Sequence, residues 1–205
     1  EPGQDVGQLS DDAKHYFELA NALLEEKTPQ LIAIGGLSGT GKTTVADSLA
    51  PKLGAAPGAR IIESDRIRKA QHGVRAETRL PAAAYNTEAS KLVYREMAQR
   101  AEAILAQGGS VVADAVFARP EDRALIEESS GGAQFHGIWL DATPALLRRR
   151  VEGRGRGSSD ADLSVLAQQL HADVGAISWR RIDASLPTEE ITDAIIKYIS
   201  SPPRR

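Results

Sequence analysis

The fold of this 205-residue chain is decided by the stretch Ile32-Ala33-Ile34-Gly35-Gly36-Leu37-Ser38-Gly39-Thr40-Gly41-Lys42-Thr43-Thr44. Residues 36–43 complete the pattern G-x-x-x-x-G-K-[ST], in which a glycine-rich turn between a strand and a helix wraps a polyphosphate with backbone N–H groups. The flanks fit that context, because the apolar run at 31–34 predicts a buried strand and residues 43–53 have helical spacing. The sequence therefore predicts that the chain binds a nucleoside triphosphate.

Each part of this loop has an expected partner on the nucleotide. Backbone N–H groups from Leu37 to Thr43 are expected to bond the α- and β-phosphates, and the catalytic Lys42 reaches the β- and γ-phosphates. The Thr43 hydroxyl ligates Mg²⁺, and Thr44 adds an α-phosphate contact. The expected nucleotide-binding residues of the loop are Gly36, Leu37, Ser38, Gly39, Thr40, Gly41, Lys42, Thr43 and Thr44. ATP and Mg²⁺ are the expected cofactors.

The composition narrows the class of protein. A chain of 205 residues is long enough for one well-buried α/β domain and short for two. The formal net charge of -3 argues against a general nucleic-acid binder, and the lack of cysteine excludes disulfides and thiolate metal sites. No apolar run approaches a membrane span and no signal-peptide pattern is present, so a cytoplasmic protein without membrane partners is expected.

Short apolar segments alternate with helical segments along the whole chain. The five predicted strands are 31–34, 60–62, 110–113, 135–140 and 179–182. This alternation predicts a parallel sheet with helices on both faces, a three-layer α/β sandwich. Ligands of such sheets bind at the carboxyl ends of the strands, so the residues after each strand are the candidates for chemistry.

The chain divides into a domain and its extensions. Residues 1–9 are expected to be a flexible N-terminus, 29–200 the nucleotide-binding domain and 201–205 a flexible tail. A helix is predicted over 10–28, with Ser10 as its N-cap, and we expect it to pack on the domain's own sheet rather than to be a connector. The chain opens at Glu1 without an initiator methionine, so we expect either an excised fragment of a longer protein or a trimmed chain.

An acid and an arginine follow the second strand. Ser64 is the predicted N-cap of the next helix, with Asp65 in the first turn and Arg68 three residues later on the same face. In that position Asp65 accepts the proton of an attacking hydroxyl, and Arg68 binds a charged acceptor or the transferring group. The alternative is that Asp65 complements the helix dipole and pairs with the arginine.

Asp114 follows the third strand. An apolar strand that ends in an acid is the arrangement of an aspartate that holds Mg²⁺ through water. Arg119 precedes the helix-starting Pro120 and is expected to face the cleft, with an ordinary surface arginine as the alternative.

Arginines and glycines follow the fourth strand, and a polar loop follows the fifth. A lid is predicted at about 152–162, and Arg150 and Arg154 are its candidates for neutralising charge in the transition state. Asp183 and Ser185 are expected near the base of the nucleotide, whereas Trp179 is predicted to be core.

Six segments carry a resemblance to a known family. They are 34–42 (IGGLSGTGK), 63–68 (ESDRIR), 77–81 (ETRLP), 112–117 (VADAVF), 159–162 (SDAD) and 179–185 (WRRIDAS). The chain over about 15–195 resembles the predicted P-loop kinases, whose AAA-type, zeta-toxin-like ATP-binding domain is often fused behind an aminoglycoside-phosphotransferase-like domain. More distantly it is similar to polynucleotide kinase, zeta-toxin, gluconate kinase and chloramphenicol phosphotransferase.

The resemblance implies ATP-dependent phosphorylation of a hydroxyl, with Asp65 as the base and Asp114 on the magnesium side. It also implies the nucleotide-kinase strand order 2-3-1-4-5 and, in a longer protein, a fused N-terminal domain. The expected function is a kinase acting on a small-molecule acceptor, whose pocket is predicted within 66–107. A nucleotide-dependent regulatory module and a nucleic-acid end kinase are the alternatives, and the acidic net charge counts against the second.

Overall fold

Strand β1 (Gln30–Gly35) lies at the centre of a five-stranded sheet in the computed structural model, which describes residues 6–24, 27–153 and 160–201. The other strands are β2 (Arg60–Glu63), β3 (Val111–Asp114), β4 (Gln134–Asp141) and β5 (Arg180–Asp183). All four pairings are parallel and the order is β2-β3-β1-β4-β5, which confirms the predicted order. Because β1 lies between β3 and β4, its carboxyl end opens at the crevice where such sheets bind ligands.

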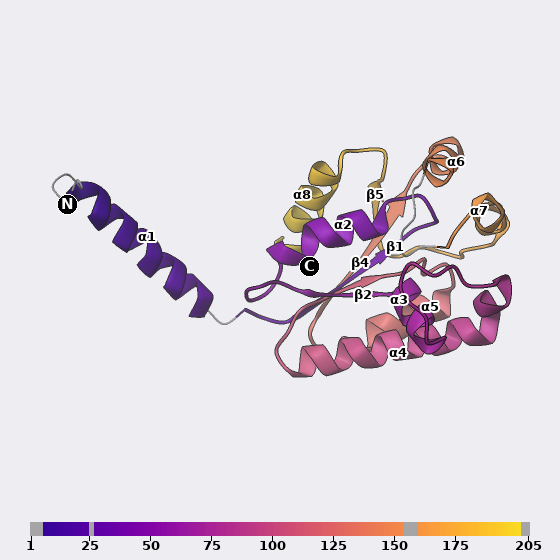
Figure 1. Cartoon of the computed structure of the whole chain (residues 1–205), viewed down its shortest axis with the longest axis horizontal. Helices are drawn as coiled ribbons and strands as arrows, with labels where there is room; N and C mark the ends of the chain where they lie inside the picture. Colours follow the sequence, from indigo (N-terminus) through magenta and orange to yellow (C-terminus); the bar gives the residue numbers. More distant parts are fainter. Residues whose placement is uncertain (1–5, 25–26, 154–159, 202–205) are drawn as a thin grey trace.

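Helices cover both faces of the sheet, as Figure 1 shows. One face carries α2 (Lys42–Leu49) and α8 (Thr188–Ile199), and the other carries α3 (Ser64–Gln71), α4 (Thr87–Ala106) and α5 (Pro120–Glu128). The alternation of side chains along β1 sets these layers: Leu31 and Ala33 pack under α4, whereas Ile32 and Ile34 pack under α2 and α8. The predicted three-layer sandwich is confirmed.

Both tryptophans of the chain pack where β1 enters the phosphate loop. A Cβ placed on Gly35 would lie 3.0 Å from Cε3 of Trp139 and 3.1 Å from Cζ3 of Trp179. A Cβ on Gly137 would overlap the Trp179 indole at 2.3 Å. Trp179 is therefore core, as predicted, and only glycines leave it room in the adjoining strands.

The N-terminal helix α1 (Val6–Leu24) departs from the sequence expectation in two ways. It begins before Ser10, and its described side chains are exposed rather than packed on the sheet, including Tyr16, Phe17 and Leu24. Figure 1 shows α1 standing away from the sheet. The apolar stripe that predicted the helix therefore has no partner among the described residues.

Several predicted boundaries shift by a few residues, as helix and strand ends commonly do. The helix after the phosphate loop ends at Leu49 and a short 3-10 turn follows at Ala50–Lys52. Ser64 is the first residue of α3 rather than its cap, which is Glu63. The described helices include none that is both long and apolar enough to cross a membrane.

Candidate functional site

Glycines give the phosphate loop its shape. Gly36 has φ 140°, and a Cβ there would lie 2.6 Å from the Leu140 carbonyl oxygen. Gly41 has φ 89°, and no atom lies within 4 Å of its Cβ position, so a side chain at this residue would enter open space. The glycines therefore let the loop curve into a cradle of backbone atoms, with left-handed backbone at the N-cap of the helix that follows.

The helix that follows the cradle presents backbone donors to it. Gly41 is the N-cap of α2 and no side chain caps the helix, so the N–H groups of its first turn face the cradle. The Lys42 ammonium lies 3.1 Å from the Leu37 carbonyl oxygen, folded across the loop. Together the helix dipole, the backbone donors and the lysine suit a polyphosphate.

The metal candidates Thr43 and Asp114 lie together. The Thr43 hydroxyl donates to Asp114 Oδ2 at 2.6 Å, and Asp114, the last residue of β3, is 5% exposed. Burial raises the pKa of Asp114 to about 6, although the Lys42 ammonium and the Thr43 hydrogen bond favour the carboxylate. The described residues contain no cluster of three acids or histidines that would hold a metal alone. The pair fits Mg²⁺, which prefers a hydroxyl, one or two carboxylates, waters and substrate phosphates.

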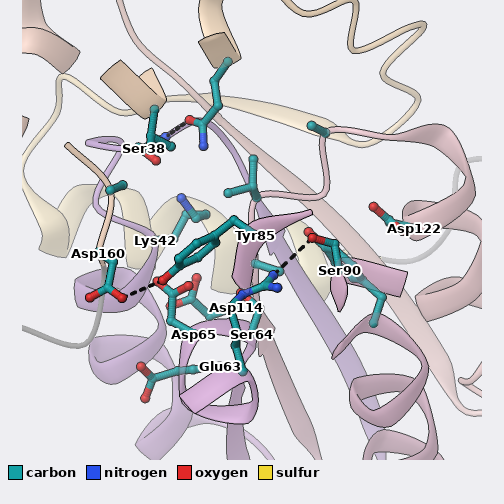
Figure 2. A pocket seen from close by; sticks show the side chains of 18 of the residues that line it. Ser38, Lys42, Glu63, Ser64, Asp65, Tyr85, Ser90, Asp114, Asp122 and Asp160 are labelled. Carbon is teal, nitrogen blue, oxygen red and sulfur yellow. Dashed lines mark hydrogen bonds between the residues drawn. The ribbon is translucent and has the colours of Figure 1, made fainter. Parts of the chain in front are cut away.

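A cavity of about 500 Å³ extends from this pair across the carboxyl edge of the sheet. Lys42 and Thr43 line one side of it, and Asp65 from the first turn of α3 lines another. Figure 2 shows Lys42, Asp65, Tyr85 and Asp114 among the residues that line this cavity. The predicted base and the predicted metal acid thus share one cavity with the phosphate loop.

Arg68 lies on the wall of this cavity and is largely buried, with 6% of the residue exposed. Its Nη1 donates to the Ala84 carbonyl oxygen at 2.9 Å, and its Cζ lies 4.7 Å from the centre of the Tyr85 ring. Nη2 lies 3.4 Å from Ser90 Oγ, and the buried Nε has no partner among the described residues. These contacts fix the Arg68 guanidinium, so a positive charge lies on the wall of the cavity. It lies on the same side of α3 as Asp65, as the spacing of three residues predicted.

A buried ion pair joins the two sides of the cavity. Lys69 Nζ lies 3.0 Å from Asp160 Oδ1, and Asp160 Oδ2 accepts from the Tyr85 hydroxyl at 2.6 Å and from the Leu80 N–H at 2.8 Å. Burial opposes ionisation of Asp160, but these hydrogen bonds outweigh it and hold the pKa of Asp160 below its usual range. The carboxyl-terminal end of the predicted lid, at Asp160, is thereby tied to α3 and to the segment between α3 and α4.

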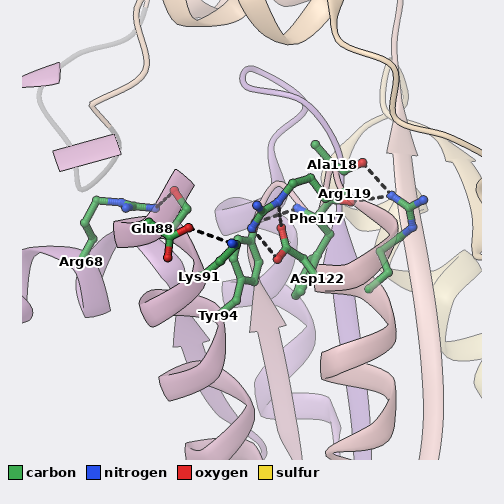
Figure 3. Close-up of polar contacts among 10 residues, drawn as sticks. Arg68, Glu88, Lys91, Tyr94, Phe117, Ala118, Arg119 and Asp122 are labelled. Carbon is green, nitrogen blue, oxygen red and sulfur yellow. Dashed lines mark hydrogen bonds and ion pairs between the residues drawn. The ribbon is translucent and has the colours of Figure 1, made fainter. Parts of the chain in front are cut away.

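Arg119 faces the same cavity, paired with a neighbour. Its Nε and Nη2 donate to the two oxygens of the buried Asp122 at 2.9 and 2.8 Å (Figure 3). The preceding turn is strained, because Phe117 has φ 50°. Two hydrogen bonds hold this turn in place. The Phe117 N–H donates to the Tyr94 hydroxyl at 3.1 Å, and Arg123 donates to the Phe117 carbonyl oxygen.

Arg150 is not among the described residues that line this cavity. In α6 (Pro144–Glu152), its Nη1 donates to the Ala184 carbonyl oxygen at 2.8 Å. It lines a second hollow of about 200 Å³ together with Gly39, Thr44 and Leu186. Arg150 thus contacts the loop after β5 and lines a hollow beside the phosphate loop, and its role in neutralising charge on the phosphates stays a prediction.

The other predicted site residues divide into two groups. Asp183 accepts from the Ser185 N–H at 2.8 Å and shapes the loop after β5, and neither residue is among the described lining of the second hollow. Arg154 and most of the predicted lid lie outside the described residues. The segment 66–107 forms only part of the acceptor-side wall, because residues of the segment 160–169 also line the cavity.

Sequence reasoning missed Lys69, Asp160 and Gln169. Asp160 lies in the SDAD segment, whose pattern indicates only a helix cap, a role that Asp162 fulfils by accepting from the Ser164 N–H at 3.0 Å. The one sequence signal for Lys69 is its place beside Arg68 on a helix whose next turn is polar. Gln169, which contacts the phosphate loop, has no sequence signal.

A family model described as AAA domain matches residues 31–172. Among curated proteins, an uncharacterized protein of Mycobacterium tuberculosis is 27% identical over 186 residues, which cover 87% of this chain and 36% of that protein. A protein of Mycobacterium bovis matches equally. The chain thus spans about a third of the length of the curated relatives that it matches.

Solved structures of kinases share the fold. The Mycobacterium tuberculosis APS kinase in complex with AMPPNP and APS has a TM-score of 0.64 and 20% identity, covering 85% of this chain and 99% of that chain. An unliganded sugar kinase of a Janibacter species has a TM-score of 0.61 and 20% identity, covering 84% and 95%. At such identities the likeness establishes the architecture alone.

Proposed function

We propose, from the premise that this chain belongs to the AAA domain family and has the P-loop kinase fold, that it is an ATP- and Mg²⁺-dependent kinase. The reaction transfers the γ-phosphoryl group of ATP to a hydroxyl of a small molecule. One observation carries the proposal: the phosphate-loop residues Lys42 and Thr43 line the same cavity of about 500 Å³ as Asp65 and Asp114. The proposed site for the phosphoryl donor and the proposed site for the acceptor therefore share one cavity.

The donor side is assigned to the phosphate loop and to the end of β3. Apart from the Ser38 N–H, which donates to the Gln169 side chain, the backbone N–H groups of the loop and of the first turn of α2 bind the phosphates, and Lys42 neutralises charge toward the γ-phosphate. Thr43 and Asp114 hold Mg²⁺, the carboxylate through water. When bound, ATP supplies the phosphoryl group and Mg²⁺ withdraws charge from it. The second hollow, with Arg150 and the loop after β5, suits the nucleoside end of ATP.

The acceptor side is assigned to α3 and its neighbours. Asp65 orients the acceptor hydroxyl and takes its proton, because it lines the cavity beside the phosphate loop. Arg68 and Arg119 bind the acceptor or the transferring oxygens from two walls. Most of the rate enhancement then comes from positioning and electrostatics.

The charge of the cavity favours a small acceptor over a nucleic-acid end. Its described lining contains the acids Glu63, Asp65, Asp114, Asp122 and Asp160 and the cations Lys42, Arg68 and Arg119. A polymeric phosphodiester requires a predominantly basic track, which this lining does not provide. The regulatory-module alternative requires no acceptor space, whereas here a cavity opens beside the phosphate loop.

The wider setting of the domain is also a proposal. The exposed apolar side chains of α1 support a contact with a further, N-terminal domain in a longer protein. We place the reaction in the cytoplasm, where ATP and Mg²⁺ are available.

A phosphate-transfer screen tests the function. Nucleosides, sugars and aminoglycosides are offered with Mg·ATP to the wild type and to Asp65→Asn, with the exposed Asp173→Asn as the matched control. We expect turnover of one hydroxyl acceptor by the wild type and the control, and a loss of about 10²- to 10⁴-fold in Asp65→Asn. Equal turnover by all three proteins would eliminate Asp65 as the base.

The nucleotide site is tested separately by calorimetry with Mg·ATP. Lys42→Ala removes the charge expected at the β- and γ-phosphates, so its affinity should fall by at least about tenfold. An unchanged affinity would contradict the assignment of this loop.

A further inference from the structure

Gln169 reaches across from another helix to the phosphate loop. Its Oε1 accepts from the Ser38 backbone N–H at 2.8 Å, although the two residues are 131 positions apart in sequence. The dashed line at Ser38 in Figure 2 marks this bond. A donor of the phosphate loop is therefore occupied by a side chain of α7 (Leu163–His171).

The chemistry of this bond fixes the orientation of the amide. A backbone N–H can only donate, so Gln169 must present its oxygen to Ser38 and its NH₂ group elsewhere. Gln169 lines the same cavity as Lys42 and Asp65, and no partner of its amide nitrogen is found among the described residues. Two N–H donors are thus left for a ligand of this cavity.

The helix that carries Gln169 is held at its N-terminus and at its middle. Asp162 caps α7 by accepting from the Ser164 and Val165 N–H groups at 3.0 and 3.1 Å. Leu166 is fully buried against Leu147 and Val151 of α6. The helix backbone that carries Gln169 is therefore fixed beside the cavity, which lowers the conformational entropy lost when the Gln169 amide binds a ligand.

We propose that Gln169 binds the γ-phosphoryl group of ATP through its Nε2 amide while its Oε1 remains on the Ser38 N–H. This inference rests on the proposed function. Charge in phosphoryl transfer is spread over the oxygens of the transferring group, and positioned donors stabilise it. Gln169 adds a neutral donor to the charge of Lys42, and the contact is specific to the triphosphate, because ADP has no γ-phosphoryl group.

The test compares affinities for ADP and for a non-hydrolysable ATP analogue, measured by calorimetry with Mg²⁺ and without any acceptor. Gln169→Glu keeps an oxygen for the Ser38 N–H and turns the donors into a negative charge. Its affinity for the ATP analogue should fall by about 10- to 100-fold, while its affinity for ADP stays within about twofold of the wild type. Gln169→Leu, which removes the donors without adding charge, should lose about tenfold for the ATP analogue alone.

Gln168 also lines the cavity but, in the described part of the chain, has no bond to the phosphate loop, so Gln168→Glu, which places the same charge one residue along α7, controls for charge in the cavity and should lose less than Gln169→Glu. Thermal unfolding of each variant checks the fold. Equal losses for both nucleotides, or no loss, would overturn the role of Gln169. Tighter binding of the ATP analogue by Gln169→Leu would also overturn it, since the side chain would then be competing with the γ-phosphate for Ser38. A wild type that binds neither nucleotide would overturn the proposed function itself.

Discussion

Replacing the buried Asp114 by asparagine should raise the free energy of unfolding of the protein without nucleotide or metal, by an amount that depends on pH. Burial raises the pKa of Asp114 from 3.8 to about 6 in the folded chain. At about 1.4 kcal/mol per pKa unit, that difference corresponds to about 3 kcal/mol against the charged form. Asparagine keeps an oxygen for the Thr43 hydroxyl, whose bond to Asp114 is 2.6 Å long, and carries no charge.

The sign follows from proton linkage. A carboxyl whose pKa is raised by folding contributes its full stability below pH 4, and this contribution is lost as the pH rises through about 6. The amide introduced by Asp114→Asn does not titrate. The free energy of unfolding of Asp114→Asn, relative to the wild type, should therefore rise by up to about 3 kcal/mol between pH 4 and pH 7.

Urea unfolding at pH 4, 5, 6, 7 and 8 in metal-free buffer measures this difference. The control is Asp183→Asn, because the Ser185 N–H lowers the pKa of Asp183, so that this carboxyl is ionised in the folded and the unfolded chain over most of this range and its difference should stay nearly flat with pH. A difference between Asp114→Asn and wild type that stays flat with pH would refute the argument that burial of this carboxylate costs stability.

Three further outcomes are expected. The Mg²⁺-dependent affinity for ATP should fall as the pH drops below about 6, where Asp114 takes up a proton, and titration calorimetry of Asp114→Asn should lack this pH dependence. Gly41→Ala should lose roughly 1–2 kcal/mol of stability from its left-handed backbone, and nucleotide affinity should fall in the same calorimetric assay because alanine disfavours this conformation at the N-cap of α2, where the phosphate loop ends. Asp160→Asn leaves the buried Lys69 without its carboxylate and should cost about 3–5 kcal/mol in urea unfolding, whereas Asp162→Asn, which keeps a good helix cap, should cost far less. Similar losses of unfolding free energy in Asp160→Asn and Asp162→Asn would contradict the stabilising role assigned to the ion pair between Lys69 and Asp160.

The local parts of the donor site could be predicted from the sequence. Residues 36–43 and the strand before them form a continuous motif, and Asp114 closes an apolar run, so each signal lies within a few neighbouring residues. The strand order came with the family resemblance. The structure confirms that order, and it brings Thr43 and Asp114 to hydrogen-bonding distance.

The remaining features depend on contacts that no local pattern encodes. Gln169 meets Ser38, and Asp160 meets Lys69, only because α7 and the segment before it fold back over the sheet edge. Arg150 was assigned to a lid from composition alone, and the direction in which α6 turns it is set by packing against the loop after β5. The apolar stripe of α1 predicted a helix correctly but could not say which surface covers it.

The two tryptophans beside Gly35 have a consequence for the intrinsic fluorescence of the protein. They are the only indoles in the chain, both are buried, and both face the residue that precedes the phosphate loop. Their ultraviolet emission therefore comes from the junction of β1 and the nucleotide cradle. Movement of Gly35 when the cradle fills would change the surroundings of both rings. The unlabelled protein thus carries an intrinsic fluorescent reporter beside its proposed site, suited to stopped-flow measurement of nucleotide arrival and departure.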